Sequence, residues 1–275
     1  MRIQRSTIAT VGAATASAML FKWERDARQA AERFAAAALE TLLNAIDAND
    51  SETGAHVRRV ATYALIIADA AGLDDHHKRI VEQVALFHDI GKIHEALFDI
   101  IHDDKKLTPA ERRAVLTHPQ RGADVLAPLE AFYPELPEGV VAHHERWNGK
   151  GYPRQLKGRR IPLSARIVAI ADTFDAITHS RRYSVERSSE SARDVILAGR
   201  GTEFDPHLVD LFILPPVFKQ IADTQARVER WRVPVKARKM GEPERQVPDV
   251  TFRWRPETKE ERARPAQDRQ RRKAR

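Results

Sequence analysis

The stretch Asp75–Lys92, with the sequence DHHKRIVEQVALFHDIGK, decides the fold class. Its apolar residues recur at helical spacing and form one buried face, at Ile80, Val81, Val84, Ala85 and Phe87. This face carries His88 and Asp89 toward the protein interior. Burying an ionised carboxylate is costly unless it is paired or binds a metal ion. The stretch therefore predicts a helix over residues 75–92 that brings polar groups to a buried site.

The rest of the chain also has a helical pattern. We predict helices over residues 22–48, 54–71, 138–146, 162–179 and 217–231. The capping box Thr108-Pro109-Ala110-Glu111 and Pro206 each open a shorter helix, and Pro119 ends or kinks the first of these. No segment shows the period-two alternation that is typical of a half-buried strand. The sequence therefore predicts an all-α fold.

Composition excludes several classes of function. With 275 residues, 42% of them hydrophobic, the chain can bury a sizeable core. It has no cysteine, which excludes disulfides, a thiolate nucleophile and thiolate metal sites, and makes a reducing cytoplasmic setting the default. The net charge of +7 comes from the C-terminus: residues 227–275 carry 17 basic and 8 acidic residues, whereas residues 1–226 carry 29 and 31. The body is nearly neutral, so no specific DNA binding is predicted.

The two ends of the chain differ from its body. Residues 6–21 are uncharged, follow Arg2 and Arg5, and contain Ala16-Ser17-Ala18, as a signal peptide would. They are mostly Ala, Thr and Ser and are shorter than the roughly 20 apolar residues of a membrane-spanning helix. We favour the start of a surface helix, with a signal segment or membrane anchor as the alternative. Residues 232–275 hold five prolines and basic runs, which predicts a disordered basic tail, either solvated or in contact with acidic partners.

Histidines near carboxylates are the informative feature of the body. Glu52 and His56 lie four residues apart, and Asp172 and Asp175 three apart, so each pair shares a helix face. The adjacent residues His143 and His144 follow an apolar run, and His118 precedes a helix-opening proline. Each feature alone is typical of a cap or a surface pair. Together, imidazoles and carboxylates without sulfur form the ligand set for iron, manganese or zinc.

The order of these residues resembles a known family. His56, His88-Asp89 and Asp172 match the ligand pattern of the HD superfamily of metal-dependent phosphohydrolases. His88-Asp89-Ile90-Gly91-Lys92 and the run HHERWNGKGYP at residues 143–153 resemble the two blocks that name its HD-GYP subfamily. The resemblance covers about residues 40–213. It implies a helical bundle of the HD type and a cyclic di-GMP phosphodiesterase that holds two or three divalent metal ions, iron or manganese.

The resemblance also implies roles for single residues. The implied metal ligands are Glu52, His56, His88, Asp89, His118, His143, His144 and Asp172. Asp89 is the implied bridging carboxylate, and Glu52 matches the acid of members with three metals. Lys92 and Arg181 match phosphate-binding residues, and Asp175 matches a second acid that orients Lys92 or a proton. The implied catalytic residues are Lys92, Asp89 and Asp175, and the implied substrate-contacting loop holds Gly151, Tyr152 and Pro153, with packing as the alternative role of the Tyr152 ring.

The chain departs from the family pattern near the expected substrate site. After Lys92 it reads IHEALFD where the family commonly has IGIPD, and we expect the extra His94, Glu95 and His102 to be surface residues. Ser184 replaces a second phosphate-binding base, and Gln155 replaces a common glycine. None of these changes removes a metal ligand. We therefore expect a competent metal site, with the departures confined to the expected substrate site.

These observations predict the organisation and function of the chain. The predicted segments are an N-terminal helical or anchor segment 1–39, a catalytic domain 40–216, an extra helix 217–231 and the tail 232–275. The predicted function is hydrolysis of cyclic di-GMP to pGpG and/or GMP in bacterial second-messenger signalling, in the cytoplasm. The alternatives are an HD phosphohydrolase for another nucleotide or cyclic dinucleotide, and a catalytically weak module that binds cyclic di-GMP. A homodimer is left open.

Overall fold

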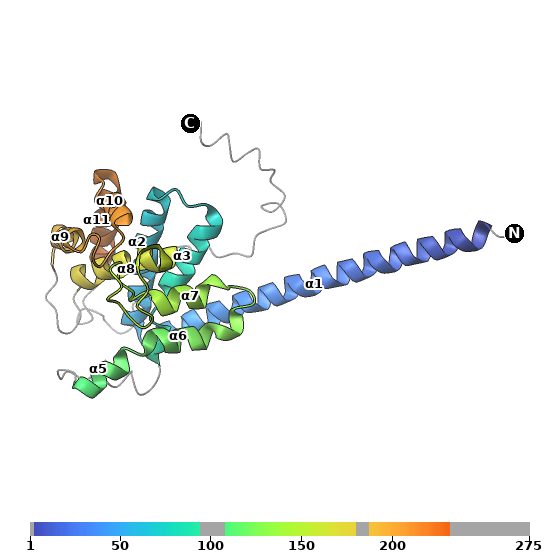
Figure 1. Cartoon of the computed structure of the whole chain (residues 1–275), viewed down its shortest axis with the longest axis horizontal. Coiled ribbons are helices and arrows are strands. Elements are labelled where there is room, and N and C mark those ends of the chain that lie inside the picture. The colour runs from blue at the N-terminus through green and yellow to red at the C-terminus, as the bar shows by residue number, and fades with distance from the viewer. Residues whose placement is uncertain (1–2, 94–107, 180–186, 232–275) are drawn as a thin grey trace, which may run out of the picture. The chain divides into compact units, whose positions relative to one another are not determined.

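The computed structural model describes residues 3–93, 108–179 and 187–231, and within them the chain is built from helices (Figure 1). They are α1 (Ile3–Asn49), α2 (Ser51–Ala70), α3 (Asp75–Phe87), η1 (Ile90–Ile93), α5 (Pro109–Val115), α6 (His118–Leu126), η2 (Ala127–Leu129), α7 (Glu135–Ala142), η3 (Gly158–Arg160), α8 (Leu163–Thr178), α9 (Ser189–Ala198), α10 (Pro206–Phe212) and α11 (Pro215–Trp231). The one β-type pairing in these ranges is an isolated bridge between Arg200 and Phe204. The all-α fold class is confirmed.

The described part of the chain divides into two compact units, with the boundary inside α1 between Leu42 and Leu43. The first unit is the long N-terminal part of α1. Among the described residues, no helix has the length and apolar character needed to cross a membrane. The basic tail, residues 232–275, lies outside the described residues.

The second unit is a helical bundle centred on α2, α3 and α8. Helix α2 packs against α3 and α8, α3 also contacts α7, and α6 packs against α7 and η1 (Figure 1). The buried rings of Tyr63, Phe174 and Phe212 meet edge to face at centroid distances of 5.1 and 5.9 Å, which ties α2 and α8 to α10. This packing places the polar residues of α2 opposite those of α8.

Several local signals act as the sequence predicts. The Thr108 side chain and Glu111 form the reciprocal capping box that starts α5, and Pro119 lies in the first turn of α6. Gly72 follows α2 with a φ of +70°, a conformation that a glycine adopts without strain.

Three helices differ from the prediction. Helix α3 ends at Phe87 rather than at residue 92, and the chain continues through the 3-10 turn η1. Helix α7 covers Glu135–Ala142 rather than 138–146, because Pro137 fits in its first turn and the chain leaves the helix at His143. Helix α9 was not predicted, since only two of its residues, Ala192 and Ile196, are buried and its apolar signal is weak.

The cap of α3 gives a pH-dependent prediction. The Asp74 carboxylate accepts hydrogen bonds from the backbone N–H of His77 and from its ring, and these bonds lower the pKa of Asp74 to about 2. We expect Asp74→Ala to lower the free energy of unfolding by about 1 kcal/mol at pH 7. Because the folded-state pKa is below the ordinary value of 3.8, this contribution is present above about pH 4 and is lost as the pH falls toward 2.

Urea unfolding of the parent chain and of Asp74→Ala between pH 7 and pH 3 measures how much stability the Asp74 cap contributes at each pH. The Asp74→Asn variant is the control, because an amide oxygen also caps a helix but does not titrate. A stability difference between Asp74→Ala and the parent chain that stays constant down to pH 3 would contradict the assignment.

Candidate metal centre

Two groups of potential metal ligands lie in the second unit. One consists of His56 from α2, His88 after α3 and Asp172 from α8, and the other of His118, His143 and His144. In each group the three ligand atoms lie within 4.8 Å of one another. The structure thus brings together six of the predicted ligands from five separate helical segments, α2, α3, α6, α7 and α8.

Asp89 lies between the two groups. Its Oδ2 is 3.4 Å from His88 Nε2 and 3.8 Å from His56 Nε2, whereas its Oδ1 is 3.3 Å from His118 Nε2. Its burial opposes ionisation, but the nearby Lys92 cation holds the pKa of Asp89 well below its ordinary value. Lys92 Nζ donates to Oδ2 at 2.6 Å. One ionised carboxylate therefore faces both groups, the geometry expected of a bridging ligand.

The ends of helices fix the orientation of three histidine rings. The Nδ1 atoms of His88, His118 and His143 lie 2.7, 2.8 and 2.6 Å from the carbonyl oxygens of Ala85, Val115 and Val140. These carbonyls belong to the last turns of α3, α5 and α7, where no intrahelical N–H is available to them. A carbonyl only accepts, so each Nδ1 carries a proton, and the nitrogen left to bind a metal ion is Nε2.

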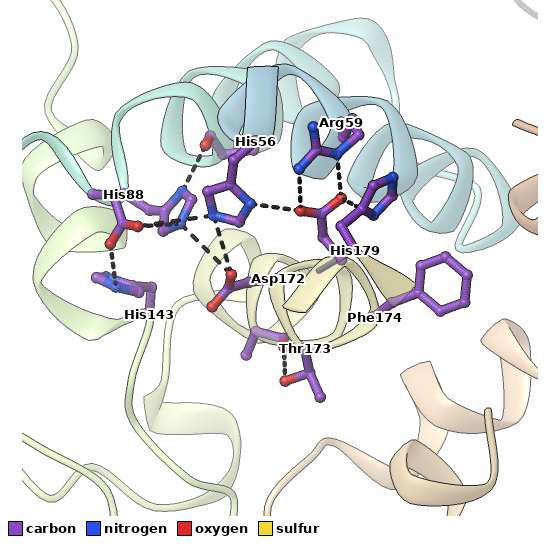
Figure 2. Close-up of polar contacts among 12 residues, drawn as sticks. His56, Arg59, His88, His143, Asp172, Thr173, Phe174 and His179 are labelled. Carbon is purple, nitrogen blue, oxygen red and sulfur yellow. Dashed lines mark hydrogen bonds and ion pairs between the residues drawn. The ribbon is translucent and has the colours of Figure 1, made fainter. Parts of the chain in front are cut away.

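The unprotonated nitrogens converge. His118 Nε2 and His143 Nε2 are 3.2 Å apart, and lone pairs at that distance repel unless a cation or a proton lies between them. Within the described residues, the buried atoms His56 Nε2, His88 Nε2 and Asp89 Oδ1 have no hydrogen-bond partner. Figure 2 shows His56, His88, His143 and Asp172 pointing toward one another. Orphaned acceptors that face a common centre fit a divalent metal ion.

The charge states fit as well. Burial lowers the pKa of His143 well below its ordinary value, and the rings of His144, His88 and His118 lower it further. Burial and His118 lower the pKa of His144 to about 4. Both rings are therefore neutral at pH 7, which is the form that binds metal. Burial opposes charge on His56, but the nearby carboxylates of Asp172 and Asp175 raise its pKa.

The remaining predicted residues lie in different places. Glu52 is exposed in the first turn of α2 and belongs to neither ligand group. Asp175 contacts His56, Arg59 and His179, whereas Lys92 contacts Asp89, so the predicted role of Asp175 in orienting Lys92 is corrected. Asp175 does not reach Lys92 because it lies one helical turn beyond Asp172, where its side chain is buried against α2. Arg181, Ser184, His94, Glu95 and His102 lie outside the described residues.

The predicted substrate loop is held by Glu145. Its two carboxylate oxygens accept the backbone N–H groups of Arg154 at 2.7 Å and Leu156 at 3.0 Å. Gly151 packs so closely that an added Cβ would lie 2.3 Å from the nitrogen of Arg146, and Pro153 is exposed. The Tyr152 ring stacks on His144 with centroids 4.9 Å apart. Burial, together with Asp89 and Asp172, raises the pKa of Tyr152, so its hydroxyl is a neutral donor beside the metal centre.

Sequence reasoning missed Arg59, His179 and Glu145. Arg59 is three residues after His56, and His179 is four after Asp175, so helical spacing was a signal for both. Glu145 is buried and accepts from backbone N–H groups, a contact that no spacing rule indicates.

Removing the Glu145 carboxylate should release the loop. We expect Glu145→Ala to cost about 2 kcal/mol of stability, because two backbone N–H groups lose their acceptor, and to speed hydrogen exchange at Arg154 and Leu156. Glu138→Ala is the matched control, since Glu138 makes only an exposed ion pair with Arg154 and should cost at most about 0.5 kcal/mol. Equal exchange rates in both variants would show that Glu145 does not hold the loop.

Gln155 occupies the position where the resembled family commonly has glycine, and its φ is +53°. Left-handed backbone costs an L-residue about 1–2 kcal/mol. We expect Gln155→Gly to raise the free energy of unfolding by about 1 kcal/mol in urea unfolding, since glycine adopts this conformation without strain. Gln155→Ala keeps the Cβ and serves as the control. A Gln155→Gly variant no more stable than Gln155→Ala would refute the expectation.

Buried imidazoles and carboxylates on a helical bundle, without a thiol, define a histidine–carboxylate metal centre. The chain belongs to the HD domain family, which matches residues 40–208 and is metal-dependent. The resemblance found in the sequence is thus confirmed.

Proteins of known function are similar to this chain. It is 37% identical over 174 residues to the 3'3'-cGAMP-specific phosphodiesterase 2 of Vibrio cholerae, covering 62% of this chain and 33% of that protein. It is 37% identical over 177 residues to the cyclic di-GMP phosphodiesterase response regulator RpfG of Xanthomonas campestris, covering 64% and 46%. A cyclic di-GMP phosphodiesterase of Thermotoga maritima is 35% identical over 198 residues, covering 71% and 53%.

The chain spans about a third to a half of the length of these relatives. Among solved structures, the cyclic GMP-AMP specific phosphodiesterase V-cGAP3 of V. cholerae aligns with a TM-score of 0.49 and 24% identity, covering 70% of this chain and 52% of that one.

Proposed function

We propose that this chain is a metal-dependent phosphodiesterase that hydrolyses cyclic di-GMP to pGpG and/or GMP. The observation that carries the proposal is Asp89, whose two oxygens face two separate groups of ligands. Such a carboxylate fits a two-metal site, the arrangement used for in-line displacement at phosphorus. The relatives named cyclic di-GMP phosphodiesterases in Xanthomonas campestris and Thermotoga maritima support the substrate class.

The chain's own residues divide the work. His56, His88 and Asp172 would hold one ion, His118, His143 and His144 a second, and Asp89 would touch both. We propose iron or manganese, because imidazole and carboxylate ligands suit both metals. Glu52 as the ligand of a third ion stays a prediction. When bound, the ions supply a Lewis acid for the phosphoryl oxygens and an activated water.

Two further side chains would act on the substrate. Lys92 is partly exposed beside Asp89, and its remaining N–H donors can bind a phosphoryl oxygen and stabilise the charge that develops there. Tyr152 stacks on His144 and keeps its proton at neutral pH, so it can donate a hydrogen bond to the substrate without titrating. Glu145 would hold the backbone around Gly151 and Pro153 in one conformation while the substrate binds.

A second cyclic dinucleotide is a specific alternative substrate. The relative named a 3'3'-cGAMP-specific phosphodiesterase is as similar to this chain, at 37% identity, as the one named RpfG. Metal ions held by the two groups would act on phosphoryl oxygens, which the two dinucleotides share. The choice between guanine and adenine therefore depends on residues outside the two ligand groups.

A side-by-side assay tests both substrates. The purified chain is loaded with Fe(II) or Mn(II) without oxygen, incubated with cyclic di-GMP or with 3'3'-cGAMP, and the products are separated by chromatography. We expect metal-dependent release of pGpG or GMP, and none from an Asp89→Ala blank. Faster cleavage of 3'3'-cGAMP than of cyclic di-GMP would make 3'3'-cGAMP the preferred substrate. Bound metal without cleavage of either dinucleotide would overturn the phosphodiesterase proposal.

We also propose that the chain works in the cytoplasm. The absence of cysteine and a nucleotide substrate both suit a reducing compartment that contains nucleotides. Dimer formation and contacts of the tail with acidic partners stay predictions.

A further inference from the structure

Asp175 is a carboxylate beside the metal centre that receives donors on both oxygens. It is 1% exposed. Its Oδ2 lies 2.7 Å from His56 Nδ1 and 2.8 Å from Arg59 Nη2, and its Oδ1 lies 2.7 Å from Arg59 Nε and 3.0 Å from His179 Nδ1. Figure 2 shows His56, Arg59 and His179 converging on one place between α2 and α8. Both oxygens of Asp175 therefore act as acceptors.

This contact makes His56 different from the other ligand rings. His88, His118 and His143 each place Nδ1 on a neutral main-chain carbonyl. His56 places Nδ1 on an ionised carboxylate. An imidazole that donates to a carboxylate is held in one tautomer and becomes a stronger base at its other nitrogen. In His56 that other nitrogen is Nε2, which lies 3.3 Å from Asp172 Oδ1 inside the first ligand group.

Arg59 keeps Asp175 in this role. Its planar guanidinium donates to both oxygens of Asp175, which fixes the plane of the carboxylate. It is also the cation that compensates the buried negative charge, since it is 7% exposed. Because Arg59 and His56 lie one turn apart on α2, the same helix carries the ligand and the group that orients its partner.

We propose that Arg59 and Asp175 are positioning residues for His56. They raise metal affinity in the group His56, His88 and Asp172 and leave the affinity of the group His118, His143 and His144 unchanged. The proposal rests on the metal centre of the proposed function. In this proposal Asp175 orients the metal ligand His56 and does not act on the substrate.

The Asp175→Asn variant tests the proposal with little change of shape. An amide has one acceptor oxygen, whereas Asp175 receives donors on both, so in either orientation its NH2 group faces an N–H of Arg59. When that NH2 group faces His56 as well, the ring is driven to the tautomer with the proton on Nε2, so the nitrogen that faces the ligand group no longer offers a lone pair. We expect affinity at the first group to fall by about 10–100-fold, with the second group unchanged.

Two measurements on the full chain follow this effect without substrate. Titration with Mn(II), followed by electron paramagnetic resonance, gives the number of ions bound and their affinities. Nitrogen-15 NMR of labelled histidines in the metal-free chain gives the tautomer of each ring. The parent chain should show two classes of Mn(II) site and His56 protonated on Nδ1, whereas Asp175→Asn should weaken one class and shift the His56 tautomer.

Arg59→Lys is the second variant, because lysine keeps the positive charge and loses the planar fork. It should weaken Mn(II) binding at the first ligand group by a smaller factor than Asp175→Asn does. If Asp175→Asn fails to fold, Arg59→Lys tests the proposal in its place. Asp205→Asn is the matched control: Asp205 pairs with Arg166 at 2.5 Å, is buried, and lies outside both ligand groups, so its Mn(II) binding should equal that of the parent chain.

Two results would overturn the proposal. One is unchanged Mn(II) affinity and unchanged His56 tautomer in folded Asp175→Asn or Arg59→Lys. The other is an equal loss at both classes of site, which would indicate general loosening of the bundle. Failure of the phosphodiesterase assay together with the predicted Mn(II) shift would remove the proposed function and leave the positioning role intact.

Discussion

Asp89→Ala should lower turnover by at least about 10³-fold and reduce metal binding in both ligand groups. The reason is geometric, since the two oxygens of Asp89 face His88 on one side and His118 on the other. Its removal takes a negative ligand from both groups and leaves Lys92 without its partner. The measurements are metal content per chain by mass spectrometry and product formation by chromatography.

The matched control for this variant is Asp210→Ala. Asp210 makes a comparably short ion pair with Arg200, at 2.6 Å, but on the protein surface, and it belongs to neither ligand group. We expect it to keep the metal content and the turnover of the parent chain. If Asp89→Ala keeps both ions with the affinity of the parent chain, Asp89 is not a bridging ligand.

Gly91→Ala should be among the most destabilising single methyl additions in the second unit. A Cβ at this position would lie 2.1 Å from the carbonyl oxygen of His118 and 2.6 Å from the nitrogen of Gly122, both backbone atoms. Backbone atoms inside α6 cannot move aside as a side chain can, so η1 must separate from α6. We expect a loss of about 3 kcal/mol, which is about 6–12 °C in Tm for a domain of this size.

The same shift should damage the metal centre, because the contact between η1 and α6 is what brings His118 Nε2 to 3.3 Å from Asp89. Thermal unfolding of the metal-free chain and Mn(II) titration measure the two effects. Gly201→Ala is the control: Gly201 has a φ of +73° but no atom within 4 Å of an added Cβ, so only about 1 kcal/mol of backbone strain is expected. If Gly91→Ala is no less stable than Gly201→Ala, the close approach of η1 to α6 is not a constraint.

Local signals in the sequence determined much of this protein. Helical periodicity predicts the elements around α2, α3 and α8, and the capping box at Thr108 starts α5, because both depend on residues a few positions apart. Motif order identified His56, His88, Asp89 and Asp172 as one set. The absence of cysteine limited any metal centre to imidazole and carboxylate ligands.

Other features depend on contacts between distant segments. The ends of α3 and α7 differ from the periodic pattern because His88 and His143 turn back to bind free carbonyls of the last helical turn. The partner of Asp175 is likewise decided by packing: α8 presents this carboxylate to His56 and Arg59 on α2, more than a hundred residues earlier in the chain.

Sequence alone thus determined which side chains can bind a metal ion, because that is a property of each residue type. Only the tertiary structure decided how they divide into two groups around Asp89, which tautomer each ring adopts and which charges are compensated. Those properties follow from distances of about 3 Å between atoms that helix packing brings together, and such distances are not encoded in spacing along the chain.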